Sequence, residues 1–177
     1  MGFLKMKKGF FVSAVTALVV SHSAFAADIG DGTIRFKGEI VDAPCVVSAD
    51  SQNQEINLGQ VKATTLATAG DKSTAKPFQI KLEECDITSK TKVKVQFNGL
   101  ADADGRLLVN NEAGAATNVT IGLFDKAGAD IKVGTATAEE ILREGQHVLY
   151  YSAAYVSKGS ATPGYGNSQV DFDVTYN

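Results

Sequence analysis

The sequence is poor in several residue types on which whole classes of proteins depend. Its 177 residues include no tryptophan, two methionines, two cysteines, two histidines and three prolines. A collagen-like chain is excluded by the low proline content, and a disordered chain is excluded because 44% of the residues are hydrophobic and only 21% are charged. The composition therefore indicates one folded domain with one core.

The longest apolar run lies near the N-terminus and is too short for a membrane anchor. Gly9 to Val20 is a run of twelve residues, whereas a membrane-spanning helix needs about 20. Three lysines at positions 5, 7 and 8 precede the run, and small residues follow it up to Ala26. This pattern is typical of a secretory signal peptide, so we predict a signal peptide at residues 1–26 with cleavage after Ala26.

The charge balance argues against nucleic acid as a partner. The full chain has a formal net charge of −3, and removal of the signal peptide takes away three lysines and no acidic residue. No basic block remains that could hold phosphates. Lys90, Lys92 and Lys94 alternate with valines, which predicts that these lysines line the solvent face of one strand.

The two cysteines are expected to form a disulfide bond. Export takes Cys45 and Cys85 into an oxidising compartment, where a thiol pair normally becomes a bridge. The alternative is a metal-binding or catalytic thiol pair, but no CxxC spacing and no histidine cluster accompanies the cysteines. In the chain-entropy model a bridge across this loop stabilises the fold by about 4 kcal/mol. We therefore expect a structural disulfide and no cofactor or metal.

Apolar residues recur with period two in short segments, which predicts strands with one buried face. Turn-forming residues such as Asn98-Gly99 and Thr162-Pro163-Gly164 separate these segments. The predicted fold class is all-β, an antiparallel β-sandwich. One short helix is predicted at Thr137 to Arg143, where Thr137 and Glu140 fit a capping box. The alternating segments are Phe78–Leu82, Val93–Phe97, Val119–Leu123, Leu149–Tyr155 and Val170–Tyr176.

The two ends of the mature chain do not fit a self-contained sandwich. Gly32 to Phe36 alternates like a strand well before the first cysteine, and Val170 to Tyr176 alternates most regularly of all but is followed only by Asn177. About six strands are present where an immunoglobulin-type sandwich has seven. A missing strand would leave an open groove that the N-terminal strand of a neighbour can fill. The pattern alone is equally compatible with an N-terminal segment that pairs within its own chain.

The sequence offers no catalytic constellation, so we predict that the protein is not an enzyme. His147 is the one histidine after the signal peptide, and no nucleophile motif or orienting acid accompanies it. We expect it to be a solvated turn residue. Neighbouring carboxylates such as Glu83 and Glu84 would point to opposite faces of a strand, which does not suit shared acid and base chemistry.

An ordered set of short motifs resembles the chaperone-usher pilins, specifically major subunits similar to type 1 fimbrial pilin. No single motif is specific, but their order, the signal peptide, the cysteine pair and the length are specific together. The motifs are Gly32-Thr33-Ile34-Arg35-Phe36-Lys37-Gly38-Glu39, Cys45, Leu58-Gly59-Gln60-Val61, Leu66, Gly70, Ser73, Phe78-x-Ile80-x-Leu82 with Cys85, Ala116-Thr117-Asn118-Val119, Ala153-x-Tyr155, Gly164 and Tyr176.

The resemblance implies an immunoglobulin-like Greek-key sandwich that lacks its last strand. In such pilins a periplasmic chaperone lends a strand, and at the outer-membrane usher the N-terminal extension of the next subunit replaces it by donor-strand exchange. The implied organisation is an extension at residues 27–37 and an incomplete domain at residues 38–177. Gly32, Ile34 and Phe36 would insert, Val170, Phe172, Val174 and Tyr176 would receive them, and the carboxylate of Asn177 would anchor basic chaperone residues.

The function implied is that of a structural subunit of a fimbrial rod that supports adhesion at the cell surface. Its partners would be copies of itself, the chaperone, the usher and minor tip or adhesin subunits. A minor adaptor or terminator subunit, or an adhesin-type binding module, remains the alternative. An adhesin usually carries a receptor domain ahead of the pilin domain, and the residues after the signal peptide leave no room for two domains.

Overall fold

The computed structural model describes residues 33–40 and 42–177, and the chain divides between Glu39 and Ile40 into two units. The predicted signal peptide with Ala26, as well as Gly32, lies outside the described residues. Residues 33–39 are exposed and form neither helix nor strand. The alternation at 33–36 therefore produces no strand here, because a strand needs a partner edge for its backbone hydrogen bonds.

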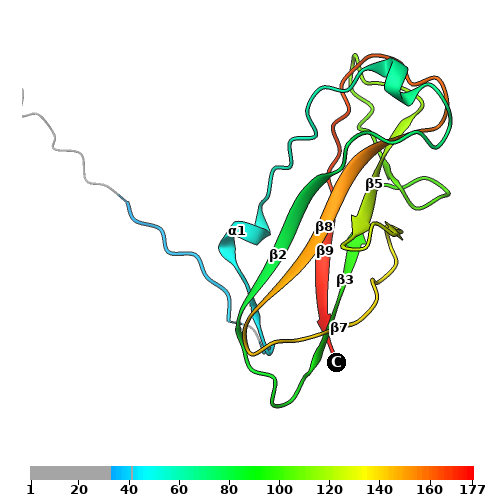
Figure 1. The fold of residues 1–177 in the computed structure, drawn as a ribbon. Helices are drawn as coiled ribbons and strands as arrows, with labels where there is room; N and C mark the ends of the chain where they lie inside the picture. Colours follow the sequence, from blue (N-terminus) through cyan, green and yellow to red (C-terminus); the bar gives the residue numbers. More distant parts are fainter. Residues whose placement is uncertain (1–32, 41) are drawn as a thin grey trace, which may run out of the picture. The chain divides into compact units, whose positions relative to one another are not determined.

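The second unit is a sandwich of two sheets, and all pairs of its named strands are antiparallel (Figure 1). The larger sheet has the order β1-β2-β8-β5-β4, with β6 also paired to β5, and the smaller sheet has the order β7-β3-β9. This confirms the predicted all-β class. Within the described ranges, no helix is long and apolar enough to cross a membrane.

The strands of the larger sheet are β1 (Val46–Val47), β2 (Lys76–Cys85), β4 (Leu107–Leu108), β5 (Val119–Asp125), β6 (Asp130–Ile131) and β8 (Gly145–Ser157). Those of the smaller sheet are β3 (Lys92–Asn98), β7 (Glu140–Ile141) and β9 (Asp171–Tyr176). A short helix α1 (Ala49–Gln52) and a 3-10 turn η1 (Ala63–Leu66) lie between β1 and β2.

The core forms where the alternating residues of the two sheets meet. Ile80 and Leu82 of β2, Leu149 of β8, and Val95 and Phe97 of β3 are each at most 1% exposed. Their neighbours in sequence face outward, as period-two alternation requires. Two of the three lysines predicted on the solvent face of one strand fit this pattern, because Lys92 and Lys94 flank the buried Val93 and are not themselves buried, whereas Lys90 precedes β3.

The predicted disulfide is present between Cys45 and Cys85, and both cysteines are buried. It joins the residue that precedes β1 to the last residue of β2. Val46 and Val47 then pair with Glu83 and Leu82. The bridge therefore fixes the start of the domain to the edge of the larger sheet.

The prediction of a helix at Thr137–Arg143 was wrong. The backbone groups of this segment bond to β3 and its flank instead, since Thr137 N–H donates to Val95 O at 2.8 Å and Leu142 N–H donates to Thr91 O at 2.9 Å. The Thr137 hydroxyl accepts a hydrogen bond from Val95 N–H at 3.0 Å. A capping box is a weak local preference, and pairing with a strand edge together with burial of Leu142 outweighs it.

The prediction of a solvated turn for His147 was also wrong. β8 begins at Gly145, so period two places His147 on the inward face with Leu149, and its side chain is only 6% exposed. Neither ring nitrogen has a hydrogen-bond partner among the residues that the structure describes. Burial lowers the pKa of His147, with Glu140 opposing this effect and Arg143 and Lys126 adding to it.

This burial predicts that the folded domain loses stability in weak acid. An unfolded histidine takes up a proton near pH 6.5, whereas the buried imidazole resists protonation to lower pH. The unfolded state therefore binds more protons, so the stability is complete above about pH 6.5 and falls as the pH drops toward the lowered pKa. Urea unfolding at pH 7 and pH 5 measures this change. In His147→Gln the free energy of unfolding should no longer change with pH near pH 6. A pH dependence equal to that of the parent would show that His147 is not the group responsible.

Candidate functional site

An open groove runs between the edges of the two sheets, and it consists of two hollows in succession. The first hollow has a volume of about 810 Å³ and the second about 750 Å³. One wall is the segment that runs from Ser51 through the first hollow to Leu66 in the second. The other wall is the segment from Ala161 to Phe172. Because the wall residues of one hollow follow directly on those of the other, the hollows form a single groove.

The floor of the first hollow is the hydrophobic core itself. Phe78 and Ile80 of β2 and Phe97 of β3 line it, and so do Leu107, Ile121, Leu123 and Ala153 of the larger sheet. The Phe78 ring contacts those of Phe97 and Tyr151, with centroid distances of 6.2 and 5.6 Å. Phe78 is half-buried, and the other side chains of the floor are at most 6% exposed. The hollow therefore lies directly above a packed core.

The wall at Ala161–Phe172 leads into β9, the edge strand of the smaller sheet, and Asp171 and Phe172 belong to both. Lys92 and Asn177 exchange backbone hydrogen bonds at 3.0 Å in both directions, and antiparallel pairing alternates from this pair along the strand. The even-numbered residues Phe172, Val174 and Tyr176 thus direct their N–H and C=O groups away from β3. Across the part of the chain that the structure describes, no backbone group pairs with them. The edge of β9 that faces away from β3 is therefore unpaired among the described residues, and it borders the groove at Phe172.

The opposite wall, Ser51–Leu66, includes the segment between α1 and η1, residues 53–61. Ile56, Leu58 and Val61 are half-buried and turned inward, whereas most of their neighbours are exposed. Within the described chain, this segment makes no backbone-to-backbone hydrogen bond with any strand. The Gln54 side chain ties it to β2 by donating to Gln79 O at 2.8 Å. Both walls of the groove thus carry unused backbone donors and acceptors.

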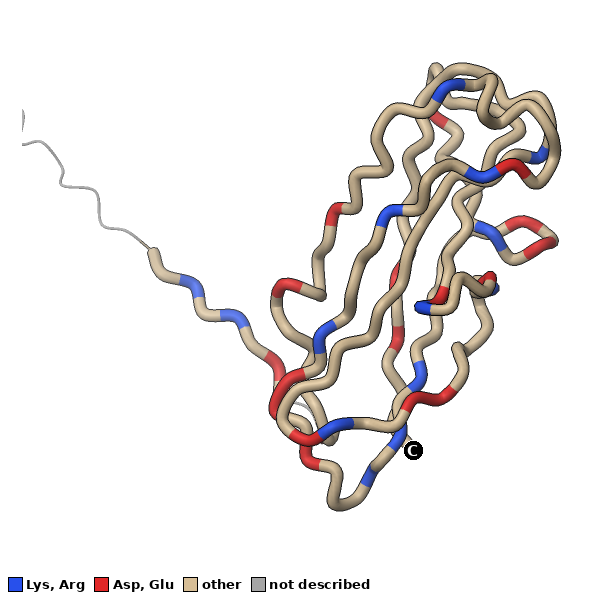
Figure 2. Tube along the Cα trace, in the orientation of Figure 1, with Lys and Arg blue, Asp and Glu red and all other residues tan. Residues whose placement is uncertain are grey.

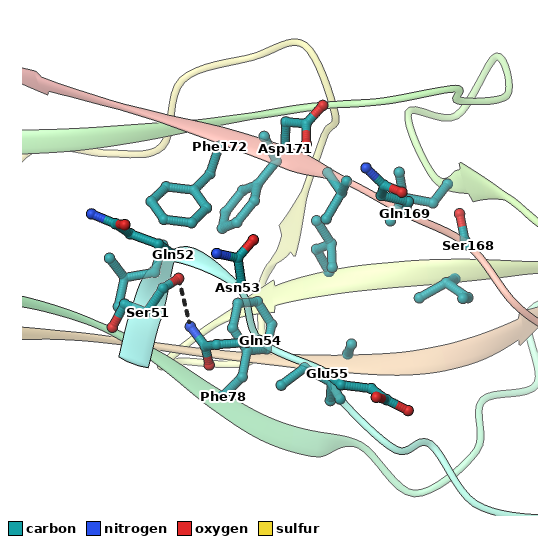
Figure 3. Close-up of a pocket in the computed structure, with 18 of the residues that line it drawn as sticks. Ser51, Gln52, Asn53, Gln54, Glu55, Phe78, Ser168, Gln169, Asp171 and Phe172 are labelled. Atoms are coloured by element: carbon teal, nitrogen blue, oxygen red, sulfur yellow. Dashed lines mark hydrogen bonds between the residues drawn. The ribbon is translucent and has the colours of Figure 1, made fainter. Parts of the chain in front are cut away.

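Polar side chains line both lips of the groove, and each lip also carries an aromatic ring. Figure 3 shows Ser51 to Glu55 with Phe78 on one side, and Ser168, Gln169 and Asp171 with Phe172 on the other. The Gln54 side chain also donates to Ser51 O at 3.3 Å. An apolar floor with polar lips suits an extended segment whose side chains alternate between apolar and polar.

The structure brings two of the four predicted receiving residues to the first hollow. Val170 and Phe172 line it. Val174 and Tyr176 face the same way and pack against the core, but they line neither hollow. Ile34 and Phe36 of the predicted inserting strand are 79% and 91% exposed, which is unusual for side chains of this kind.

Asn177 lies beside basic residues at the end of β9 (Figure 2). Its terminal oxygen accepts hydrogen bonds from the N–H groups of Thr91 and Lys92, each at 3.0 Å. Its side chain donates to Glu139 at 2.7 Å, and Lys90 Nζ donates to the neighbouring Tyr176 O at 3.3 Å. The hydrogen bonds from Asn177 and Lys92 lower the pKa of the Glu139 carboxyl.

Two features of the groove and of the exposed N-terminal segment were missed by reasoning from the sequence. The wall at residues 53–61 was not identified, although Ile56 and Leu58 alternate with polar residues. Ile40 was not included with Ile34 and Phe36, although it continues their period-two spacing and is fully exposed. Gly38 occupies the position between Phe36 and Ile40 on the same face.

The fold and the groove together define the class of protein. It is an immunoglobulin-like sandwich with a groove along one side of its core. Its edge strand β9 has no partner on its outer side among residues 33–40 and 42–177, a geometry suited to binding an extended chain as an added strand.

A model of the fimbrial protein family matches residues 34–177. Long polar fimbria protein A of Salmonella typhimurium is 58% identical, and the alignment covers 99% of each chain. The probable major fimbrial subunit LpfA of Escherichia coli O157:H7 is 52% identical over 97% of each chain. A solved chaperone-usher pilus structure superposes with a TM-score of 0.68 and 29% identity, and covers 84% of this chain and 97% of that one. The chain belongs to the fimbrial protein family and is a structural pilus subunit.

Proposed function

We propose that the groove binds the N-terminal extension of a neighbouring copy and that the chain polymerises in this way by donor-strand exchange. The observation that carries the proposal is the pair of unpaired walls above an open core. A strand laid between β9 and residues 53–61 would pair with both walls and cover the floor. One inserted segment would therefore supply both the hydrogen bonds and the apolar cover that the domain lacks.

The extension has the pattern and the length that the groove requires. Ile34, Phe36 and Ile40 share one face with Gly32 and Gly38 when the segment is extended. Nine residues from Gly32 to Ile40 span about 30 Å as a strand, which matches the nine wall residues 53–61. Burial of each large apolar side chain is worth roughly 1.5 to 3 kcal/mol. The extension at 27–37 thus gains Ile40 as a further inserting residue.

The resulting polymer would be the rod of a fimbria at the bacterial surface. The name of the 52% identical relative, a probable major subunit, favours a major over a minor role. We propose that the chain acts through these subunit contacts and not through catalysis. The histidine after the signal peptide is buried and supports no acid and base chemistry at the surface.

We propose that the chain reaches the surface through the periplasm and the outer-membrane usher. An empty groove leaves apolar side chains such as Phe78 and Phe172 only half-buried beside a free strand edge, and both features promote aggregation. A periplasmic chaperone that lends a strand would cover them until the next subunit arrives. The terminal carboxylate of Asn177 lies at the end of β9, where basic chaperone residues can bind it. Minor tip or adhesin subunits would complete the fibre.

The experiment that tests this function places a charge on the inserting face. In Phe36→Asp a carboxylate would have to enter an apolar floor, which is unfavourable unless a partner is present. We expect the variant subunit to accumulate while fibres are lost. Electron microscopy of the cells and the amount of fibre released by shearing measure the outcome.

Thr33→Asp is the matched control, because it introduces the same charge on the opposite face of the same segment. We expect Thr33→Asp to assemble as the parent does. Normal fibres from Phe36→Asp would overturn the proposed function, and equal loss from both variants would show that the charge acts outside the groove.

A further inference from the structure

Tyr155 connects the floor of the second hollow to its wall. It lies on β8, its side chain lines the second hollow, and its hydroxyl donates to Gly166 O at 3.0 Å. Burial raises the pKa of this hydroxyl, which therefore remains a donor well above neutral pH. The contact ties the segment that leads into β9 to a strand of the opposite sheet.

The ring of Tyr155 also limits how closely that wall approaches the floor. A Cβ atom on Gly166 would lie 2.5 Å from Cε1 and 2.7 Å from the hydroxyl of Tyr155. The Gly166 backbone thus rests directly on the ring, and only glycine permits this approach. The ring therefore acts as a spacer against inward movement, and the hydroxyl acts as a tether against outward movement.

The other side of the same wall is held by the loop that precedes β5. Tyr165 N–H donates to Gly114 O and Ala116 N–H donates to Tyr165 O, both at 2.9 Å, and Asn110 N–H donates to Asn167 O at 2.8 Å. Residues 165–167 are therefore clamped between this loop and Tyr155. Without the spacer, the hydrophobic effect would favour closure of the empty hollow, because closure buries apolar surface.

We propose that Tyr155 is a positioning residue that keeps the second hollow preformed for the incoming strand. This inference rests on the proposed function, because the hollow has a role only if a strand enters it. A preformed hollow avoids the cost of ordering the wall during insertion. Tyr155 thereby affects how firmly the donor strand is retained, whereas it contributes little to the pairing of β8 with β5.

The test uses fibres of the full mature chain that carry Tyr155→Phe, which retains the ring and removes the hydroxyl. Loss of one hydrogen bond predicts about fivefold faster release of subunits from fibres in denaturant. Amide hydrogen exchange at residues 165–167 should accelerate in the same fibres, while exchange in β5 should not change. In Tyr155→Leu, which also removes the ring, we expect the subunit to accumulate without forming fibres.

Tyr150→Phe and Tyr150→Leu are the matched controls, because Tyr150 lies on the same strand with an exposed side chain on the other face. Release from Tyr155→Phe fibres at the rate of Tyr150→Phe fibres would overturn the inference. Faster exchange throughout β5 would also overturn it, because Tyr155 would then support only the fold. If Phe36→Asp assembles normally, the proposed function itself fails, so the two failures are distinguishable.

Discussion

A chain that lacks residues 27–36 is expected to fold and to bind its periplasmic chaperone but to form no fibres. The groove between β9 and residues 53–61 lies outside the deleted segment, so the truncated subunit can still receive a strand. It has no strand to offer to the next groove. When the truncated and parent chains are expressed together, the truncated subunit should not be added to growing fibres, because each added subunit must donate its own strand to the subunit before it. Co-purification with the chaperone and fibre lengths in electron micrographs measure these outcomes.

A control for this deletion replaces residues 27–36 by an equally long glycine-serine segment. This control keeps the length and removes Ile34 and Phe36, so it should behave like the deletion if the apolar side chains carry the effect. Normal polymerisation of either variant would show that the donor strand lies elsewhere in the chain.

Cys45→Ser is expected to prevent accumulation of folded subunit. The bridge spans a sequence separation of 40 residues, and in the chain-entropy model it stabilises the fold by about 4 kcal/mol, out of a typical total of 5 to 15 kcal/mol. A domain with a groove along one side of its core is expected to have a small free energy of unfolding, so loss of this contribution should unfold much of the protein. Quantification of the subunit in periplasmic extracts measures the effect.

The double variant Cys45→Ser/Cys85→Ser separates loss of the bridge from reactivity of a free thiol. We expect its yield to be as low as that of Cys45→Ser, because both lack the covalent link between the start of the domain and the end of β2. Recovery of yield in the double variant would assign the defect to the unpaired Cys85, and an unchanged yield in both would mean that the bridge is dispensable.

The sequence predicted the strands well because their signal is local. Phe78, Ile80 and Leu82 alternate with polar residues, and all three lie in β2 with Ile80 and Leu82 fully buried. The same reasoning failed at Thr137–Arg143, because the capping pattern contains no information about the nearby edge of β3. It failed at His147 because the predicted strand began at Leu149, whereas β8 begins at Gly145 and extends the inward-facing alternation to His147.

The candidate site could be predicted only in part. Val170 and Phe172, which the resemblance to pilins implied as receiving residues, line the first hollow, while Val174 and Tyr176 do not. The wall at residues 53–61 forms no strand of its own, so periodicity gave too weak a signal. Tyr155 belongs to the motif Ala153-x-Tyr155, but the motif does not reveal the contact of its hydroxyl with Gly166. That contact exists only because β8 passes close to the segment that leads to β9.

The sequence by itself determined the all-β class, the disulfide pair and the family, because alternation, cysteine count and motif order are properties of the linear chain. Only the tertiary structure decided that Ser51–Leu66 and Ala161–Phe172 face each other across an open core. These segments are about a hundred residues apart, and the pairing of β9 with β3 and of β8 with β2 sets their separation. The physical reason is that burial and strand pairing act between elements, so a groove arises from their packing and has no local signature.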